Sequence, residues 1–252
     1  IKGEWVEPEG LGAMGTWLAL DTLGAVYSTE LQLESYSFSI ALAQAAEQHG
    51  VEIRSGEVTD ILRSKGRVTG VEVGGKKLNA PMVVIANGPW AVHAGAWIDF
   101  SIPVVPLRGQ IVHLDVPAGT LPPRQAIFHD SGYVLPKASG DLFIGTTIED
   151  VGFDREATTQ ARDGIMEAAS RIAPRILDIP IKSMSACLRP YTIDGNPIIG
   201  AIPGIDGLYV ATGHGFKGIT LGLVTGKALA RVMSGRKAGF SIEDFSPARF
   251  SG

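Results

Sequence analysis

The chain has 252 residues, 45% of them hydrophobic, and a formal net charge of −4, so it has enough apolar side chains for one large domain or two closely associated ones. The small negative charge, without a block of basic residues, argues against a nucleic-acid-binding surface or an anionic membrane partner. No apolar run is long enough to span a bilayer. The single cysteine, Cys187, excludes an internal disulfide and is compatible with a reducing compartment, so we expect a cytoplasmic protein.

The first part of the chain predicts one helix followed by short strands. Residues 36–49 form a candidate amphipathic helix, because Phe38, Leu42 and Ala46 share a face and Gly50 follows as a stop. Short apolar segments between glycine, serine and lysine turns then predict four strands, at residues 51–54, 58–63, 67–73 and 76–79.

A nearly continuous apolar run at residues 82–86 predicts a strand that is buried on both faces. Asn87, Gly88 and Pro89 end this run abruptly. A buried parallel strand that ends in this way delivers its backbone to the carboxyl edge of a sheet, where open α/β folds bind their ligands.

After Pro103 the pattern changes to that of an antiparallel block. Strands separated by turns are predicted at residues 104–116, 124–128, 133–136 and 142–146. A helix at 158–172 stops before Pro174, and a strand at 181–188 follows. We expect residues 189–200 to form an irregular connection.

The last part of the chain predicts a strand at residues 208–212, a turn at 213–218 and a helix at 219–233. Three glycines in the turn allow positive φ and close approach of a ligand to the main chain. The free N–H groups at the start of the helix favour an anion or a polarised oxygen. The spacing also matches G-x-G-x-x-G, but the strand and acidic residue that a dinucleotide-binding unit needs do not follow. The alternative is a tight turn that serves packing alone.

Seven short motifs occur in order along nearly the whole chain. They are residues 41–58, Val-Val-Ile-Ala-Asn-Gly-Pro-Trp at 83–90, Arg-Gly-Gln at 108–110, Tyr-Val-Leu-Pro-Lys at 133–137, residues 144–154, Leu-Arg-Pro-Tyr-Thr-Ile-Asp-Gly at 188–195, and residues 207–220. Together they resemble the flavin-dependent amine oxidoreductases of the D-amino acid oxidase, glycine oxidase and sarcosine oxidase group.

The resemblance implies an α/β (α+β) fold, in which an incomplete FAD-binding domain carries an inserted antiparallel-sheet substrate domain. The implied division is a first flavin-binding part at 1–98, a substrate-binding part at 99–186 and a second flavin-binding part at 187–252. Family members begin with a strand and a G-x-G-x-x-G turn that hold the ADP half of FAD. That element has no counterpart here, so we expect an upstream segment or a second chain to complete the FAD site.

The resemblance also implies which residues bind non-covalent FAD. The backbone of Val58 lies near the adenine, and the other residues assigned to the cofactor are Gly88, Trp90, Gly213, His214, Gly215, Gly218, Ile219 and Thr220. We interpret His214 as a flavin-edge or packing residue, because hydride transfer from a neutral amine requires no base. Cys187 occupies the place where sarcosine oxidases tether flavin, but a free cysteine is usually a small buried hydrophobe, so we expect a dissociable flavin.

Three residues are the candidates for holding an amino-acid substrate. Arg189 matches the family's carboxylate-binding arginine, and its guanidinium suits a carboxylate; the alternative is an arginine that braces a loop. Tyr133 matches a substrate-contacting tyrosine, or is a buried core residue. Lys217 matches a carboxylate-binding lysine of sarcosine oxidases, or is a solvated lysine. Sarcosine oxidases place an oxygen-activating lysine where this chain has Phe143, so the electron acceptor stays open.

The predicted function is FAD-dependent oxidation of a small amino acid or N-methyl amino acid to an imine by hydride transfer to the flavin. One alternative is oxidation of a 2-hydroxy acid by the same carboxylate clamp. Another is a non-catalytic flavoprotein fragment or subunit that needs a second chain. No motif for a metal site or a hydrolytic triad occurs in the sequence.

Overall fold

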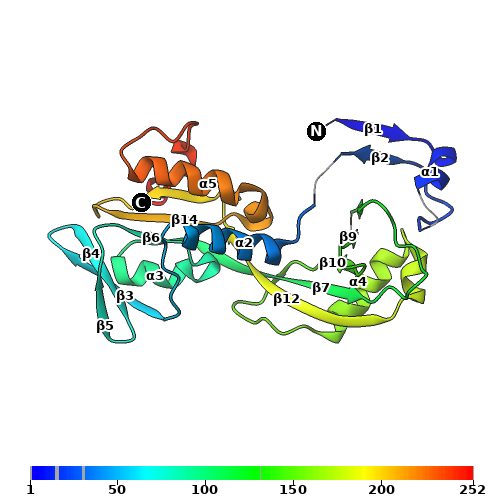
Figure 1. Cartoon of the computed structure of the whole chain (residues 1–252), viewed down its shortest axis with the longest axis horizontal. Helices are drawn as coiled ribbons and strands as arrows, with labels where there is room; N and C mark the ends of the chain where they lie inside the picture. The colour runs from blue at the N-terminus through cyan, green and yellow to red at the C-terminus, as the bar shows by residue number, and fades with distance from the viewer. Residues whose placement is uncertain (1, 15–16, 30–31, 131, 252) are drawn as a thin grey trace. The chain divides into compact units, whose positions relative to one another are not determined.

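The computed structural model describes residues 2–14, 17–29, 32–130 and 132–251, and these form two compact units that the chain visits in turn (Figure 1). Unit 1 consists of Ile1–Gln48, Arg108–Glu149 and Asp154–Cys187, and unit 2 consists of His49–Leu107, Asp150–Phe153 and Leu188–Gly252. Both units mix helices with strands. The functional division at residues 98 and 186 stays a prediction.

Unit 2 contains two three-stranded sheets. One is an antiparallel sheet of order β3-β4-β5, and the other has the order β13-β14-β6. In the second sheet, β14 pairs antiparallel with β13 and parallel with β6. The bounds are β3 (Val58–Ser64), β4 (Arg67–Val73), β5 (Lys76–Asn79), β6 (Val83–Ile85), β13 (Ile198–Ala201) and β14 (Leu208–Thr212). The helices of unit 2 are α3 (Ala91–Ile98) and α5 (Gly218–Met233).

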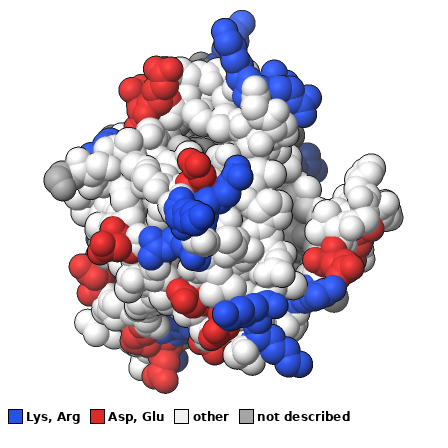
Figure 2. Space-filling view, turned by 90° about the vertical axis from the view of Figure 1, so that its left-hand side faces the viewer, with Lys and Arg blue, Asp and Glu red and all other residues white. Residues whose placement is uncertain are grey.

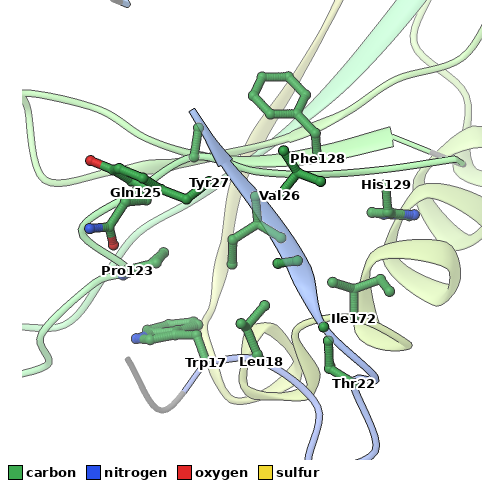
Figure 3. Close-up of a pocket in the computed structure, with 14 residues that line it drawn as sticks. Trp17, Leu18, Thr22, Val26, Tyr27, Pro123, Gln125, Phe128, His129 and Ile172 are labelled. Atoms are coloured by element: carbon green, nitrogen blue, oxygen red, sulfur yellow. The ribbon is translucent and has the colours of Figure 1, made fainter. Parts of the chain in front are cut away.

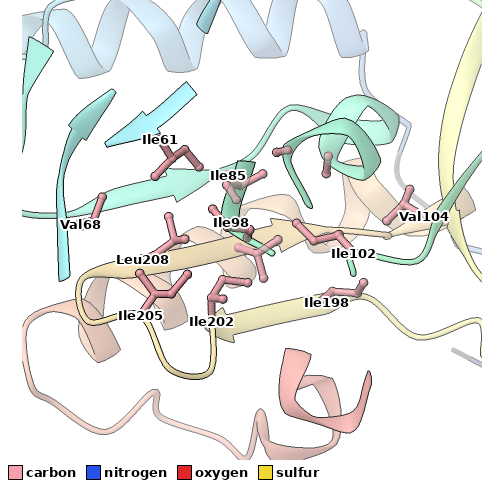
Figure 4. Close-up of a cluster of buried hydrophobic side chains, with 13 residues drawn as sticks. Ile61, Val68, Ile85, Ile98, Ile102, Val104, Ile198, Ile202, Ile205 and Leu208 are labelled. Carbon is pink, nitrogen blue, oxygen red and sulfur yellow. The ribbon is translucent and has the colours of Figure 1, made fainter. Parts of the chain in front are cut away.

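A single cluster of buried aliphatic side chains holds unit 2 together (Figure 4). It draws on strands, on α3 and on the loop between β13 and β14, which places Ile202 and Ile205 beneath Leu208. Burial of this kind contributes about 25 cal/mol for each Å² of apolar surface removed from water. The sheet that carries the predicted glycine turn therefore contributes to the buried core of the unit.

Unit 1 contains most of a six-stranded sheet of order β11-β7-β10-β9-β8, in which β12 also pairs with β7. Residues 104–107 of β7, Asp150 of β11 and residues 188–192 of β12 belong to unit 2. The pairs of β7 with β10, β10 with β9 and β8 with β9 are antiparallel, as predicted. Alternate side chains such as Val112, Val134 and Ile144 pack with Ile165 of α4 in a second buried cluster. The bounds are β7 (Val104–Leu114), β8 (Ile127–His129), β9 (Gly132–Pro136), β10 (Leu142–Gly145), β11 (Glu149–Asp150), β12 (Ile181–Thr192) and α4 (Thr159–Ser170).

Four expectations from the sequence are corrected. Residues 51–54 form no strand, because no described strand pairs with them and their side chains are exposed. Strand β6 is only partly buried, since it lies at the end of its sheet. Residues 189–192 continue β12, because pairing with β7 extends the strand and Pro190 is tolerated at a sheet margin. Residues 198–201 form β13.

Helix α2 (Ser35–Gln48) forms as predicted, but none of its residues is buried. Three further elements of unit 1 were not anticipated. They are β1 (Gly3–Val6), α1 (Pro8–Met14) and β2 (Ala25–Ser28), of which β1 and β2 pair antiparallel. The exposed sequence Trp5 to Pro8 lacks the apolar pattern of a core strand, which is why this ribbon was missed.

Charges of both signs are interspersed on the face of the molecule that Figure 2 shows. This distribution agrees with the absence of a basic block in the sequence, which argued against nucleic-acid binding. Among the described residues, no helix combines the length and apolar character that a membrane span requires.

A buried polar network connects the sheet of unit 1 to α4. Arg108, 5% exposed, donates to Glu149 through Nε and Nη2 at 3.2 Å and also bonds to Asp154. The fully buried Gln110 donates to Glu149 at 2.8 Å and accepts from the backbone N–H of Thr158 at 2.7 Å. Because Thr158 is the N-cap of α4, the network fixes the start of this helix relative to β7 and β11.

We expect Glu149→Gln to lower the stability at neutral pH and to weaken its dependence on acid. Burial alone would raise the pKa of this carboxyl, but hydrogen bonds from Arg108, Gln110 and Thr147 outweigh burial and lower the pKa to about 2. A depressed pKa means that the carboxylate stabilises the fold above its ordinary value of 4.5, and that this contribution is lost as the pH falls through about 2.

Thermal melting at pH 7 and near pH 2 measures this effect. The Glu149→Gln variant should melt several degrees lower than the parent at pH 7, and the difference should shrink in acid. The exposed neighbour Asp150 supplies the control, Asp150→Asn, which should melt like the parent. An unchanged melting temperature of Glu149→Gln at pH 7 would contradict the role of the network.

Candidate functional site

Two turns that are far apart in the sequence meet at the carboxyl edge of the parallel pair in unit 2. Val210 of β14 lies opposite Ile85 of β6, so both strands end at the same edge. The hydroxyl of Thr212, the last residue of β14, donates to the carbonyl of Gly88 at 2.8 Å. This edge is where parallel α/β sheets bind their ligands.

The glycine turn has the backbone geometry that its sequence predicted. Gly213 and Gly215 have φ of +77° and +51°, in the region that favours glycine. The turn leads into α5 through a short 3₁₀ segment, Gly215–Lys217, and no side chain of the described residues caps the start of α5. The N–H groups of Gly218, Ile219 and Thr220 belong to the first turn of α5, where the helix itself offers no acceptor, so they are candidates for binding an electron-rich group.

These features fit a flavin. Gly88 has a φ of +58°, and no described heavy atom lies within 4 Å of a Cβ built on it, so the backbone there is open to a flat ligand. Uncapped N–H groups at a helix start stabilise the negative charge that a reduced flavin carries near its pyrimidine edge. The residues at this edge would thus hold the flavin by main-chain contacts.

His214 lies inside the turn, where its ring contacts Thr225 of α5. Its Nε2 and the hydroxyl of the buried Thr225, in the second turn of α5, are 2.9 Å apart. Burial lowers the pKa of His214, so the ring is neutral near pH 7. The contact fastens the turn to α5, which supports the interpretation of His214 as a packing residue at the flavin edge.

Arg189 lies against the ring of Phe216, a residue of the glycine turn. The guanidinium carbon lies 5.0 Å from the centre of that ring, and Tyr191 meets the same ring edge-on at 6.4 Å. Phe216 belongs to the turn, and Lys217, exposed, is the next residue. Two cations are thus held near the start of α5, and a cation against an aromatic face is favourably oriented.

Tyr133 lies on β9 in unit 1, so its relation to Arg189 and Lys217 stays a prediction. Its ring covers Gly145 of β10, because a Cβ at Gly145 would lie 2.4 Å from the Cζ and hydroxyl oxygen of Tyr133. In the next row of the sheet, Phe143 stacks on His113 at 4.1 Å, and Nζ of Lys137 lies 5.0 Å from the Phe143 ring. Tyr133 is partly exposed and is not a buried core residue.

Val58 and Trp90 line one pocket of about 420 Å³ in unit 2, between β3, β6 and α3. Asn87, which precedes Gly88, lines it as well. Trp90 lies 5.8 Å from Phe153 between ring centres. The structure therefore brings the predicted adenine-side residue Val58 to the same pocket as the turn after β6.

A second pocket, of about 300 Å³, lies in unit 1 between β2 and β8 (Figure 3). Trp17, Val26 and Ile172 contribute apolar walls, and His129 stands at one side, where burial lowers the pKa of its ring. Among the described residues that line it, none is a residue that the sequence analysis assigned to cofactor or substrate.

The comparisons with known proteins show the family to which this fold belongs. Residues 1–232 match the family described as FAD dependent oxidoreductase, and the chain belongs to this family. It is 32% identical over 256 residues to a glycine oxidase of Geobacillus kaustophilus, and this alignment covers 100% of the chain and 65% of that relative. It is also 32% identical over 192 residues to a glycine oxidase of Pseudomonas aeruginosa, and this alignment covers 76% of the chain and 52% of that relative.

Solved structures give the same result. The crystal structure of the Geobacillus kaustophilus glycine oxidase has a TM-score of 0.91 at 29% identity, and covers 100% of this chain and 68% of that chain. The crystal structure of an iminodiacetate oxidase from Chelativorans sp. BNC1 has a TM-score of 0.91 at 26% identity. The match covers 98% of this chain and 67% of that chain. The predicted α/β (α+β) fold, the family and its cofactor FAD are confirmed. The chain spans about half to two thirds of the length of these curated relatives.

Sequence reasoning missed several residues that shape the site. Phe216 and Tyr191 hold Arg189 near the turn, and Thr212 and Thr225 fix the turn to Gly88 and α5. Phe216 carried a usable signal, since an aromatic residue between glycines in an exposed turn often contacts a ligand. The two threonines carried none, because their partners are distant in the sequence or buried.

Gly213→Ala and Gly222→Ala are a matched pair that tests the backbone of this site. At Gly213 the φ is +77° and a Cβ would lie 2.5 Å from Cγ2 of Thr192, whereas no described heavy atom lies within 4 Å of a Cβ at the helical Gly222. We expect Gly213→Ala to destabilise the fold by about 2 kcal/mol. Gly222→Ala should stabilise it by about 1 kcal/mol. Urea unfolding measures both, and equal effects would show that the turn is not conformationally restricted.

Proposed function

We propose that the protein containing this chain oxidises the C–N bond of a small amino acid or N-substituted amino acid. The observation that carries the proposal is the contact of Arg189 with Phe216, which puts a carboxylate-binding cation beside the predicted flavin turn within one unit. The similarity to glycine oxidases and an iminodiacetate oxidase supports an amine with a carboxylate as substrate.

The substrate's carboxylate is bound by the Arg189 guanidinium, with the Lys217 ammonium as a second cation. Phe216 limits the orientations of Arg189. Tyr133 is proposed as a further substrate contact on the family resemblance alone. The amine binds in its neutral form, so its nitrogen lone pair is available and no side chain needs to act as a base. The exposed position of Lys217 suits a group that meets a charged ligand at the mouth of a site.

Bound FAD supplies the oxidant, because its flavin accepts the hydride that leaves the carbon next to the amine. The proton on the substrate nitrogen would pass to water, which leaves an imine that water hydrolyses. The N–H groups of Gly218, Ile219 and Thr220 at the start of α5 stabilise developing negative charge. His214, neutral and held by Thr225, keeps these groups in place.

Oxidation of a 2-hydroxy acid is a second candidate, because the same carboxylate clamp would bind that substrate. Release of ammonia, an alkylamine or an aldehyde supports amine oxidation, whereas release of a keto acid with no nitrogen-containing product supports the hydroxy acid. Phe143 is stacked on His113 in the place where sarcosine oxidases have a lysine, so we propose that the acceptor be tested with O2 and with a dye in parallel.

A third candidate, a non-catalytic subunit that needs another chain, is favoured by α2. Apolar residues of this helix, such as Tyr36, Ile40 and Leu42, are exposed. Exposed apolar patches of this kind mark surfaces that another segment covers. FAD titration into the 252-residue chain, followed by flavin fluorescence, separates the cases, since saturable binding would show that the chain forms the site without a partner.

Arg189→Ala should raise KM for a carboxylate-bearing amine at least about 30-fold with little effect on melting, because a charge-assisted pair in a binding site contributes about 2 to 5 kcal/mol. Steady-state kinetics of the FAD-loaded protein measure this change. Arg171→Ala removes an exposed arginine that pairs with Glu167 four residues away, and serves as the control. Unchanged KM in Arg189→Ala would assign Arg189 to loop bracing.

Cys187 is exposed on β12, so it is not the small buried hydrophobe that the sequence analysis took it for. We still propose that FAD is held without a covalent bond to it. Acid precipitation of the FAD-loaded protein should leave the yellow colour in the supernatant. Colour that stays in the pellet of the parent but not of Cys187→Ser would identify this thiol as an attachment site.

A further inference from the structure

A tight turn follows the strand that carries Arg189. The Thr192 hydroxyl donates to the carbonyl of Asn196 at 2.7 Å, the N–H of Gly195 donates to the carbonyl of Thr192 at 3.0 Å, and the N–H of Asn196 donates to Oδ1 of Asp194 at 3.1 Å. Thr192 is fully buried, and its Cγ2 is the atom that closes off the space at Gly213. The turn at 192–196 thus supports the glycine turn directly.

Arg249 clamps this turn from the C-terminal segment. Its Nε donates to Oδ2 of Asp194 at 2.7 Å, and its Nη2 donates to Oδ1 of Asp194 at 3.3 Å and to the carbonyl of Asn196 at 3.0 Å. A guanidinium that bonds to both oxygens of a carboxylate fixes distance and direction together, which an ammonium does not. The Arg249 side chain is only 20% exposed, so water competes poorly for these bonds.

The segment that carries Arg249 is itself fixed to unit 2. Residues Pro247–Phe250 form a 3₁₀ turn, in which Pro247 is buried and Phe250 packs against the aliphatic cluster of Figure 4. The guanidinium of Arg249 lies 4.3 Å from the Phe250 ring centre and donates to the carbonyl of Ser246 at 3.1 Å. Arg249 is therefore held from its own side as well.

The clamped turn controls the two parts of the candidate site. Tyr191, which precedes Thr192, meets the Phe216 ring and lies 3.4 Å from a Cβ built on Gly215. Displacement of the turn would move Tyr191 and Thr192, and through them the ring that orients Arg189 and the support under Gly213. We infer that Asp194 and Arg249 are positioning residues that set the carboxylate-binding arginine against the flavin turn.

This inference rests on the proposed function only for its kinetic consequence. The aliphatic cluster of unit 2 includes neither Asp194 nor Arg249, so removal of the clamp should loosen the turn while the unit stays folded. If the clamp served stability alone, its removal would lower the melting temperature, and hydrogen–deuterium exchange at the two turns would increase no more than exchange in the rest of the backbone.

The test uses two mild variants and a control. Asp194→Asn keeps an oxygen that can accept from the N–H of Asn196 but removes the carboxylate charge. Arg249→Lys keeps the positive charge but removes the guanidinium that bonds to both oxygens of Asp194. Arg236→Lys changes an exposed arginine of the same C-terminal region. Hydrogen–deuterium exchange of the 252-residue chain should become about tenfold faster at residues 192–196 and 213–217 in the first two variants, and stay unchanged in the control.

In the FAD-loaded protein, the same two variants should raise KM for a carboxylate-bearing amine about tenfold and lower kcat less. Unchanged exchange at both turns would overturn the clamp whatever the enzyme does. Faster exchange with parental KM would overturn its positioning role. Failure of the proposed function would appear separately, as absent amine oxidation by the parent protein, while the exchange result would still decide whether the clamp holds the two turns.

Discussion

The parallel pairing of β6 with β14 is the constraint on which the candidate site depends. It brings the turn after Ile85 to the turn after Thr212, and the hydrogen bond from Thr212 to Gly88 joins positions 124 residues apart in the sequence. Parallel strands end on the same side of a sheet, so both glycine-containing turns face one ligand region. The aliphatic cluster beneath β14 fixes the strands β6 and β14, and the residues of the two turns do not belong to this core.

The chemistry of the site follows from what surrounds that edge. Glycine backbones allow close approach, the start of α5 supplies N–H groups, and Phe216 places an aromatic face beside Arg189. A main-chain cradle for an electron-rich cofactor thus lies next to a cation that suits a carboxylate. This combination supports the proposal that the protein containing this chain oxidises small amines that carry a carboxylate.

The local sequence pattern was sufficient to predict strands whose pairing partners are close to them in the sequence. The strand 208–212 and strands β7, β9 and β10 of unit 1 were predicted closely, because their apolar alternation and turn residues are distinct. Residues 51–54 alternate in the same way yet form no strand, since pairing needs a partner strand that local sequence does not reveal. Pro190 masked the extension of β12, whose cause is long-range pairing with β7.

The candidate site residues Arg189 and Lys217 were proposed from sequence motifs. Asp194 and Arg249, in contrast, became visible only through contacts between distant segments.

The central claim is that the glycine turn serves the flavin and not packing. Gly215→Val in the FAD-loaded protein tests it most directly, because a β-branched side chain at φ +51° would crowd the N–H groups at the start of α5. FAD content, flavin reduction potential and melting temperature are measured together. We predict loss of FAD or a lower reduction potential, with a modest shift in melting. A variant that melts much earlier but keeps normal FAD content and potential would contradict the account.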